Sequence, residues 1–356
     1  MRLSDLRLSG FRNYTDASFS FTDGVNMIVG ENGIGKTNLL EAVYLLSGNR
    51  SFRSFKSAEL INFEKDRADI IAHVFSRGRD FEIKIALSKR GKGSVFINDV
   101  RVMKKSAMSD VLRCVVFSPK DLMLIKGAAS ERRGFADCAL CQKKPGYAET
   151  LSRFERVLQS KQKLLRDEGD LSVLPELDLQ LSRYGAELIA ARAVFVRELS
   201  EKAAEIHKEI SGGKEELVLK YKTVSAVKDP FEDKKNIEKL LIDHYAEMRP
   251  AEIKKLACLS GAHKDDIEVF INGREAKAFA SQGQSRTAAI ALKFSERELL
   301  RDEGRYPLLL LDDVMSELDA PRRKYISRNT REGQTLITCC EKLPGEKPDN
   351  MIEIKR

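Results

Sequence analysis

The sequence is notable first for what it lacks. Its 356 residues include no tryptophan and only four histidines, and no apolar run approaches the roughly 18 residues that a membrane-spanning helix needs. The N-terminus, MRLSDLRLSGFRNY, is interrupted by charges and has no apolar signal-peptide core. The six cysteines are scattered through a long chain, which excludes a small disulfide-stapled scaffold and favours reduced thiols. We therefore expect a cytoplasmic protein.

The composition is that of an ordinary globular chain. Hydrophobic residues make up 42% and charged residues 33%, which excludes a disordered chain, and the length suffices for about two domains. The net charge of +8 is compatible with a nucleic-acid partner and equally with a solvated surface. Basic residues cluster at Lys89, Arg90 and Lys92, and again at Arg101, Lys104 and Lys105.

The distribution of apolar residues predicts an α/β protein with an inserted helical arm. Strands are predicted at 25–30, 68–76, 81–88, 94–99 and 114–118, and later at 217–222, 267–273, 307–314, 335–339 and 351–355. Between these two groups, 147–168 and 177–210 read as long amphipathic helices, interrupted at Pro175 and joined as an antiparallel pair. Ser211–Lys214 (SGGK) ends the second helix.

A phosphate-binding loop is the strongest motif. Gly30, Gly35, Lys36 and Thr37 fit the pattern G-x-x-x-x-G-K-[ST], between an apolar strand and an amphipathic helix. Glycines let backbone N–H groups wrap an anion, and the helix N-terminus adds a positive dipole end. Lys36 is expected to reach the β- and γ-phosphates of ATP, and Thr37 to bind Mg²⁺.

A second motif supplies the carboxylates that such a loop requires. Leu308–Leu311 predict a strand buried on both faces, as in a parallel sheet. Asp312 and Asp313 follow at its C-terminal edge, where ligands bind in such sheets. We assign Asp312 to Mg²⁺, and Asp313 to polarising the attacking water.

Several motifs together resemble one family. They are LSGFRNY, GENGIGKTNLLEAVYLL, RSFR, FSPKDLMLIKG, ERRGFAD, GAHKDD, SQGQSR and LLLLDDVMSELD, in an order that covers essentially the whole chain. The chain resembles the RecF family of bacterial DNA-repair ATPases, within the ABC-type/SMC-like ATPases. This resemblance implies an ABC-type P-loop ATPase head (a mixed sheet with a central P-loop helix) plus an inserted helical arm lobe. The implied division is 1–125 with Walker A, 126–215 as the arm, and 216–356 with the signature, Walker B and D-loop.

The resemblance also implies a function and partners. It implies an ATP-dependent homodimer on double-stranded DNA and single/double-strand junctions, acting with RecO and RecR and indirectly with RecA, which is loaded at gaps. The cofactors implied are ATP and Mg²⁺, with slow hydrolysis as a switch or timer.

Carried over residue by residue, the family motifs assign three further groups of residues. The implied nucleotide-binding residues are Arg12, Gly30, Asn32, Gly33, Gly35, Lys36, Thr37 and Asn38. Ser281, Gly283 and Gln284 match the signature motif, which contacts the γ-phosphate held by the partner subunit, and Ser316 and Asp319 match the D-loop. Two departures favour slow hydrolysis: Asp313 stands where ABC ATPases more generally carry glutamate, and TLITCC carries no switch histidine. Lys120 replaces a commoner acidic residue in FSPKDL, which leaves a nucleotide-sensing role for that loop open.

Weaker signals leave alternatives open. Cys138 and Cys141 form a lone C-x-x-C in a helical run, and core cysteines explain them better than zinc. His263–Asp266 either form a turn or act near the signature segment, and Arg132 and Arg133 either contact DNA phosphate or cap helices. Two other functions compete with the DNA clamp: a scaffold that hardly hydrolyses ATP, and a transporter's nucleotide-binding subunit.

Overall fold

The computed structural model describes residues 1–53, 56–91, 93–167, 169–341 and 347–355, so Lys92 of the first basic cluster lies outside it. These residues form two compact units, the first of 1–121, 209–212 and 289–356, the second of 122–208 and 213–288. Residues 213–288 therefore belong to the same compact unit as the helical arm. The assignment of 216–356 to the ATPase head rests on function and stays a prediction.

A parallel sheet in the first unit carries the P-loop strand. Its order among the described residues is β14-β3-β13-β12-β8, formed by Asn350–Glu353, Val25–Val29, Thr335–Cys339, Leu308–Asp312 and Cys114–Phe117. Each neighbouring pair is parallel, and β12 and β13 are buried along their whole length. The predicted buried parallel strand is confirmed, and the C-terminal ends of β3, β12 and β13 share one edge of the sheet.

An antiparallel sheet completes this unit. Its described strands run in the order β2-β1-β4-β5-β6-β7, formed by Tyr14–Ser20, Arg2–Phe11, Arg67–Ser76, Arg79–Ser88, Ser94–Ile97 and Val100–Val102. Leu3, Leu6 and Leu8 all face the core despite their uneven spacing, because the register of β1 against β4 shifts between Leu3 and Asp5. A bulge thus explains the broken alternation in the sequence.

The P-loop helix α1 (Lys36–Leu45) lies in the core between residues of both sheets. Leu39 and Leu40 pack in one cluster with Leu8 of the antiparallel sheet and with Ile28 and Leu310 of the parallel sheet. The predicted central P-loop helix is confirmed, with one refinement: the parallel and antiparallel strands form separate sheets instead of one mixed sheet. The other helical segments wholly or mainly in this unit are η1 (Ser57–Leu60), η2 (Lys105–Asp110), η3 (Pro119–Leu122), α8 (Gln282–Leu299), η6 (Met315–Glu317) and α9 (Ala320–Asn329).

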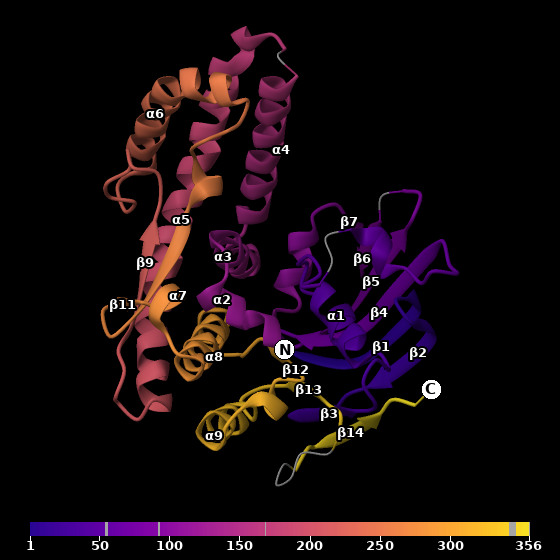
Figure 1. The fold of residues 1–356 in the computed structure, drawn as a ribbon. Coiled ribbons are helices and arrows are strands. Elements are labelled where there is room, and N and C mark those ends of the chain that lie inside the picture. The colour runs from indigo at the N-terminus through magenta and orange to yellow at the C-terminus, as the bar shows by residue number, and fades with distance from the viewer. Residues whose placement is uncertain (54–55, 92, 168, 342–346, 356) are drawn as a thin grey trace. The chain divides into compact units, whose positions relative to one another are not determined.

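The second unit is mostly helical. Its helical segments are α2 (Met123–Lys126), α3 (Ala129–Lys143), α4 (Tyr147–Arg166), η4 (Leu171–Val173), α5 (Leu174–Ile210), α6 (Lys234–Lys255), η5 (Ala262–Lys264) and α7 (Ala276–Phe279). Helices α4 and α5 run side by side (Figure 1), linked by the Lys161–Asp178 ion pair at 2.6 Å. The predicted helical pair is confirmed. Pro175 does not interrupt α5 but lies in its first turn, where a missing N–H breaks no helical hydrogen bond.

A small antiparallel sheet also belongs to the second unit. Its described strands run in the order β11-β10-β9, formed by Arg274–Glu275, Asp266–Ile271 and Leu217–Lys222. Along the described part of the chain, no helix combines the length and apolar character needed to cross a membrane.

Candidate functional site

The P-loop joins the end of β3 to the start of α1. Gly33 and Gly35 adopt φ angles of 80° and 119°, which L-residues with side chains rarely adopt. A Cβ on Gly35 would lie 2.5 Å from Asn13 Nδ2, so a larger residue would be strained in its backbone and would also displace the Asn13 side chain. The first N–H groups of α1 have no intrahelical acceptor, which leaves them available to an anion.

Lys36 is a buried cation held by neutral groups. Its Nζ donates to the carbonyl oxygens of Gly30 at 2.6 Å and Glu31 at 3.0 Å, and the residue is only 7% exposed. Within the described residues, no carboxylate lies at ion-pairing distance from Lys36. A buried charge without a counter-ion favours an anionic ligand at this position.

Thr37 and Asp312 meet at the edge of the parallel sheet. Thr37 Oγ1 donates to Asp312 Oδ1 at 2.8 Å, and Thr338 Oγ1 donates to the same oxygen at 3.1 Å. Burial raises the pKa of Asp312, opposed by these two hydrogen bonds. A hydroxyl beside one carboxylate fits Mg²⁺, which in nucleotide sites takes one or two carboxylates plus substrate phosphates. The predicted Mg²⁺ pair is thus brought together.

Asp313 lies next to this pair in an unusual conformation. Its φ is 53°, a left-handed value that aspartate tolerates better than most residues, and its N–H donates to Thr338 Oγ1 at 3.0 Å. Ser316 Oγ donates to the Asp313 carbonyl at 3.1 Å, and Asp319 caps α9 by accepting from the Arg322 N–H. Ser316, which the resemblance assigns to the D-loop, therefore contacts Asp313 itself.

The LSGFRNY motif supports the P-loop helix α1. Arg12 makes a bidentate ion pair with Glu41, both hydrogen bonds at 2.8 Å, and also donates to the Glu59 carbonyl at 2.7 Å. Asn38 donates to Asn13 Oδ1 at 2.7 Å. Arg12 is thus occupied in bracing the P-loop helix, and its contact with nucleotide stays a prediction.

Glu41 and Arg53 were missed by sequence reasoning. Glu41 is fully buried in α1, and Arg53 NH1 donates to Asn38 Oδ1 at 2.5 Å. The sequence did contain a signal for such a pairing. Glu41 lies within the apolar run LLEAVYLL, and a buried carboxylate requires a cationic partner.

Cys340 follows β13, in the segment TLITCC that carries no switch histidine. Its thiol donates to Asn32 Oδ1 at 2.9 Å and lies 3.9 Å from Lys36 Nζ. A cysteine side chain, and not an imidazole, therefore lies beside the P-loop at this point of the chain.

The signature segment, SQGQSR from Ser281 onward, forms the start of α8, where Ser281 and Gln284 hydrogen-bond each other's backbone N–H. The Gln284 N–H donates to Ser281 Oγ at 3.1 Å, while the Ser281 N–H donates to Gln284 Oε1 at 2.9 Å. This is a capping box, so the predicted Ser281 cap is confirmed. Gln284 Nε2 donates to Glu215 Oε1 at 2.9 Å, a partner that the sequence did not indicate.

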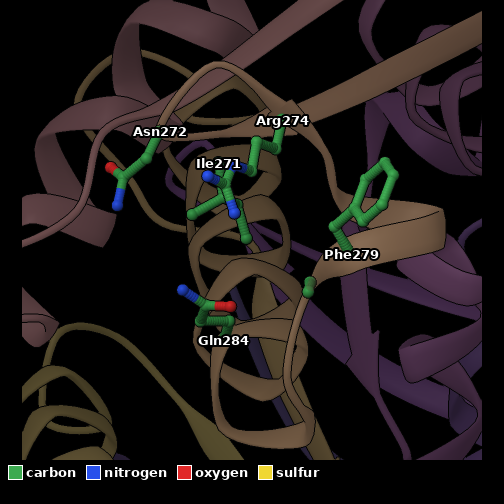
Figure 2. A pocket seen from close by; sticks show the side chains of 6 residues that line it. Ile271, Asn272, Arg274, Phe279 and Gln284 are labelled. Carbon is green, nitrogen blue, oxygen red and sulfur yellow. The ribbon is translucent and has the colours of Figure 1, made fainter.

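A pocket of about 310 Å³ adjoins this segment (Figure 2). Gln284 forms part of its wall beneath the β10–β11 hairpin, and the exposed ring of Phe279 lies on another side. The complete lining is Ile271, Asn272, Arg274, Phe279, Ala280 and Gln284. The signature segment therefore lies at the edge of an open pocket.

The motifs ERRGFAD and GAHKDD bind each other. Arg132 donates to both oxygens of Asp266, at 2.7 and 2.9 Å, and Arg133 donates to the Asp265 carbonyl at 2.6 Å. Arg192 reaches Asp265 Oδ2 at 2.8 Å. Arg132 is 5% exposed, so its function is internal pairing and not DNA contact.

The other weak signals also have structural explanations. Cys138 and Cys141 lie in α3, and no group of three or more metal-ligating side chains occurs among the residues that the structure describes. Burial lowers the pKa of His263 to about 4, which keeps the imidazole neutral at neutral pH. Cys138 and Cys141 are only half-buried, so their interpretation as core cysteines stays a prediction, whereas the short helical turn at Ala262–Lys264 fits the structural alternative for the His263–Asp266 segment.

A P-loop with a Thr–Asp pair at the edge of a parallel sheet, together with a capped signature helix elsewhere in the chain, defines an ABC-type ATPase head. The RecF/RecN/SMC N terminal domain family matches residues 2–356. The protein named DNA replication and repair protein RecF from Bacillus subtilis is 38% identical over 346 residues, covering 95% of this chain and 93% of that protein. The protein of the same name from Clostridium tetani is 36% identical over 342 residues, again covering 95% and 93%. The chain belongs to the RecF family.

Solved structures agree with this assignment. A structure of the recombination mediator protein RecF-ATP in the RecFOR pathway has a TM-score of 0.91 and 32% identity, covering 99% of this chain and 95% of that chain. An SMC head bound to the C-winged helix domain of ScpA has a TM-score of 0.56 at 17% identity, covering 99% and 94%, and shares the fold alone.

Proposed function

We propose that this chain is an ATP-dependent DNA-binding repair protein. Two copies bind two ATP molecules between them on DNA, hydrolyse them slowly and then release the DNA. With RecO and RecR, the protein promotes RecA loading at gapped DNA in recombinational repair and replication restart. A cytoplasmic, nucleoid-associated location belongs to this proposal, as does a preference for single/double-strand junctions.

One observation carries the proposal: Lys36 is buried with no counter-ion among the described residues, and the next residue, Thr37, pairs with Asp312 from the end of β12. Lys36 binds the β- and γ-phosphates, and Thr37 and Asp312 hold Mg²⁺ beside them. The metal, when bound, neutralises charge that develops on the phosphate oxygens. Asp313 orients the attacking water, and its short side chain, together with the absence of a histidine from TLITCC, favours slow hydrolysis.

The second half of the proposal concerns the signature segment. Ser281 caps α8, so the following N–H groups and the helix dipole form an anion site. Its ligand is the γ-phosphate held by Lys36 of the partner subunit. Since only the dimer adds these contacts, ATP shifts the equilibrium toward the dimer, and an isolated chain hydrolyses ATP poorly.

The test measures the mass of the protein in solution by multi-angle light scattering, with and without ATP and gapped DNA. We expect a monomer without nucleotide and a dimer with ATP, strengthened further by DNA. A fully active monomer would contradict the proposal. A single-turnover hydrolysis rate much slower than DNA release would instead favour the scaffold function.

A further inference from the structure

The signature segment is held by residues that lie outside its own motif. Both ends of the Gln284 amide are engaged, because Oε1 accepts from the Ser281 N–H at 2.9 Å and Nε2 donates to Glu215 Oε1 at 2.9 Å. This pattern fixes which way the amide points, since reversing it would place like groups against each other at both ends. Glu215 therefore determines the orientation of Gln284.

Glu215 is itself held in place. Its second oxygen, Oε2, lies 3.0 Å from His207 Nε2, and His207 is fully buried near the end of α5. The carboxylate is thus used at both oxygens and has little freedom to turn away from Gln284. A chain of contacts runs from His207 through Glu215 and Gln284 to Ser281, all within the second unit.

The loop that precedes the signature segment is held from another side. Lys126, at the end of α2, donates through Nζ to the carbonyls of Ala276 at 3.0 Å, Lys277 at 3.3 Å and Ala280 at 2.6 Å. Ala280 is the residue directly before the Ser281 cap. The ammonium group thus binds two carbonyls of α7 and the carbonyl of the residue that follows it, which fixes where the chain enters α8.

We propose that Glu215 and Lys126 are positioning residues for the signature segment, holding its phosphate-facing geometry before a partner subunit arrives. This proposal rests on the proposed function, in which Ser281 and the N–H groups after it contact the partner's nucleotide. A preformed segment lowers the ordering cost of dimerisation, so both residues act on the dimer while ATP binding by the chain's own P-loop is independent of them.

Glu215→Ala removes the hydrogen bond from Gln284, and Lys126→Met removes the hydrogen bonds to the carbonyls before the signature segment. We expect ATP affinity at low protein concentration to stay within about twofold of wild type, and the dimer dissociation constant in ATP to rise by about tenfold or more. Glu216→Ala and Lys277→Met are matched controls, since both side chains are exposed neighbours. Glu215→Gln should restore part of the dimerisation, because its carbonyl oxygen can still accept from Gln284.

A mixing experiment separates positioning from a general folding defect. Glu215→Ala supplies an intact Lys36, and Lys36→Arg supplies an intact signature segment. At protein concentrations high enough to drive both variants fully into dimers, a 1:1 mixture should recover about a quarter of wild-type hydrolysis, because random pairing makes half the dimers mixed, each with one complete site. Failure of the mixture to exceed either variant alone overturns the proposal, as does a Glu215→Ala chain that dimerises like wild type. If wild type itself does not dimerise with ATP, the proposed function fails instead.

Discussion

At the scale of single residues, the P-loop brings together groups whose spacing in sequence gives no direct sign of their contact. Thr37 and Asp312 are 275 positions apart, yet their oxygens lie 2.8 Å from each other. Lys36 reaches the backbone of its own loop and no carboxylate within the described chain. The chemistry of the site therefore depends on the size and shape of a few side chains.

Replacing Lys36 with arginine tests this dependence. The planar guanidinium is larger than an ammonium group and cannot occupy the same point between the carbonyls of Gly30 and Glu31. We expect Lys36→Arg to lower the ATP hydrolysis rate by at least about tenfold while the melting temperature changes by less than about 3 °C. Steady-state phosphate release and differential scanning calorimetry measure the two effects. An arginine variant with wild-type hydrolysis would exclude a point-charge role for Lys36.

His263 gives a prediction about pH. Its pKa is lowered by burial from 6.5 to about 4, so between these values the unfolded chain binds a proton that the folded chain does not. The stability that depends on His263 is therefore full above pH 6.5 and is lost as the pH falls toward 4. We expect a loss of roughly 3 kcal/mol over this window, and His263→Gln should flatten that slope. Urea unfolding at several pH values tests this, and equal slopes would show that His263 does not contribute.

At the scale of elements, the sequence predicted most strands and both long helices, because their apolar patterns repeat with the period of the structure that they form. The strands at 217–222 and 335–339 were predicted to the residue. The separation of parallel and antiparallel strands into two sheets was not predictable, since pairing depends on contacts distant in sequence. For the same reason the sequence indicated Lys36, Asp312 and Ser281 but not Glu41, Glu215 or Lys126, which have meaning only through their partners.

The pairing of α3 with β10 is one such distant contact. Arg132→Met leaves the partly buried carboxylate of Asp266 without its bidentate partner, and we expect the free energy of unfolding to fall by about 3 kcal/mol. Arg132→Met combined with Asp266→Asn should cost clearly less than the sum of the two single changes. A double-mutant cycle by denaturant unfolding measures this coupling. Strict additivity would show that the ion pair contributes little.

At the scale of the whole molecule, the two halves of the proposed ATP site belong to different compact units. Lys36, Thr37 and Asp312 lie in the first unit, and Ser281 with Gln284 in the second. ABC-type ATPase heads need both halves, and the proposed function supplies the second from another copy of the chain. If two copies share each ATP site, dimerisation is a step of the catalytic cycle. A substitution in the signature segment should then weaken dimerisation more than it weakens folding.

Ser281 allows these two effects to be separated. Aspartate and asparagine both cap helices about as well as serine, so Ser281→Asp and Ser281→Asn should each change the free energy of unfolding by less than about 0.5 kcal/mol. They differ in charge, and the aspartate places an anion where the partner's γ-phosphate is proposed to bind. We expect Ser281→Asp to weaken ATP-dependent dimerisation at least about tenfold more than Ser281→Asn, and the bulky Ser281→Arg to abolish it. Sedimentation velocity with ATP measures this, and equal dimerisation of the Asp and Asn variants would place the γ-phosphate elsewhere.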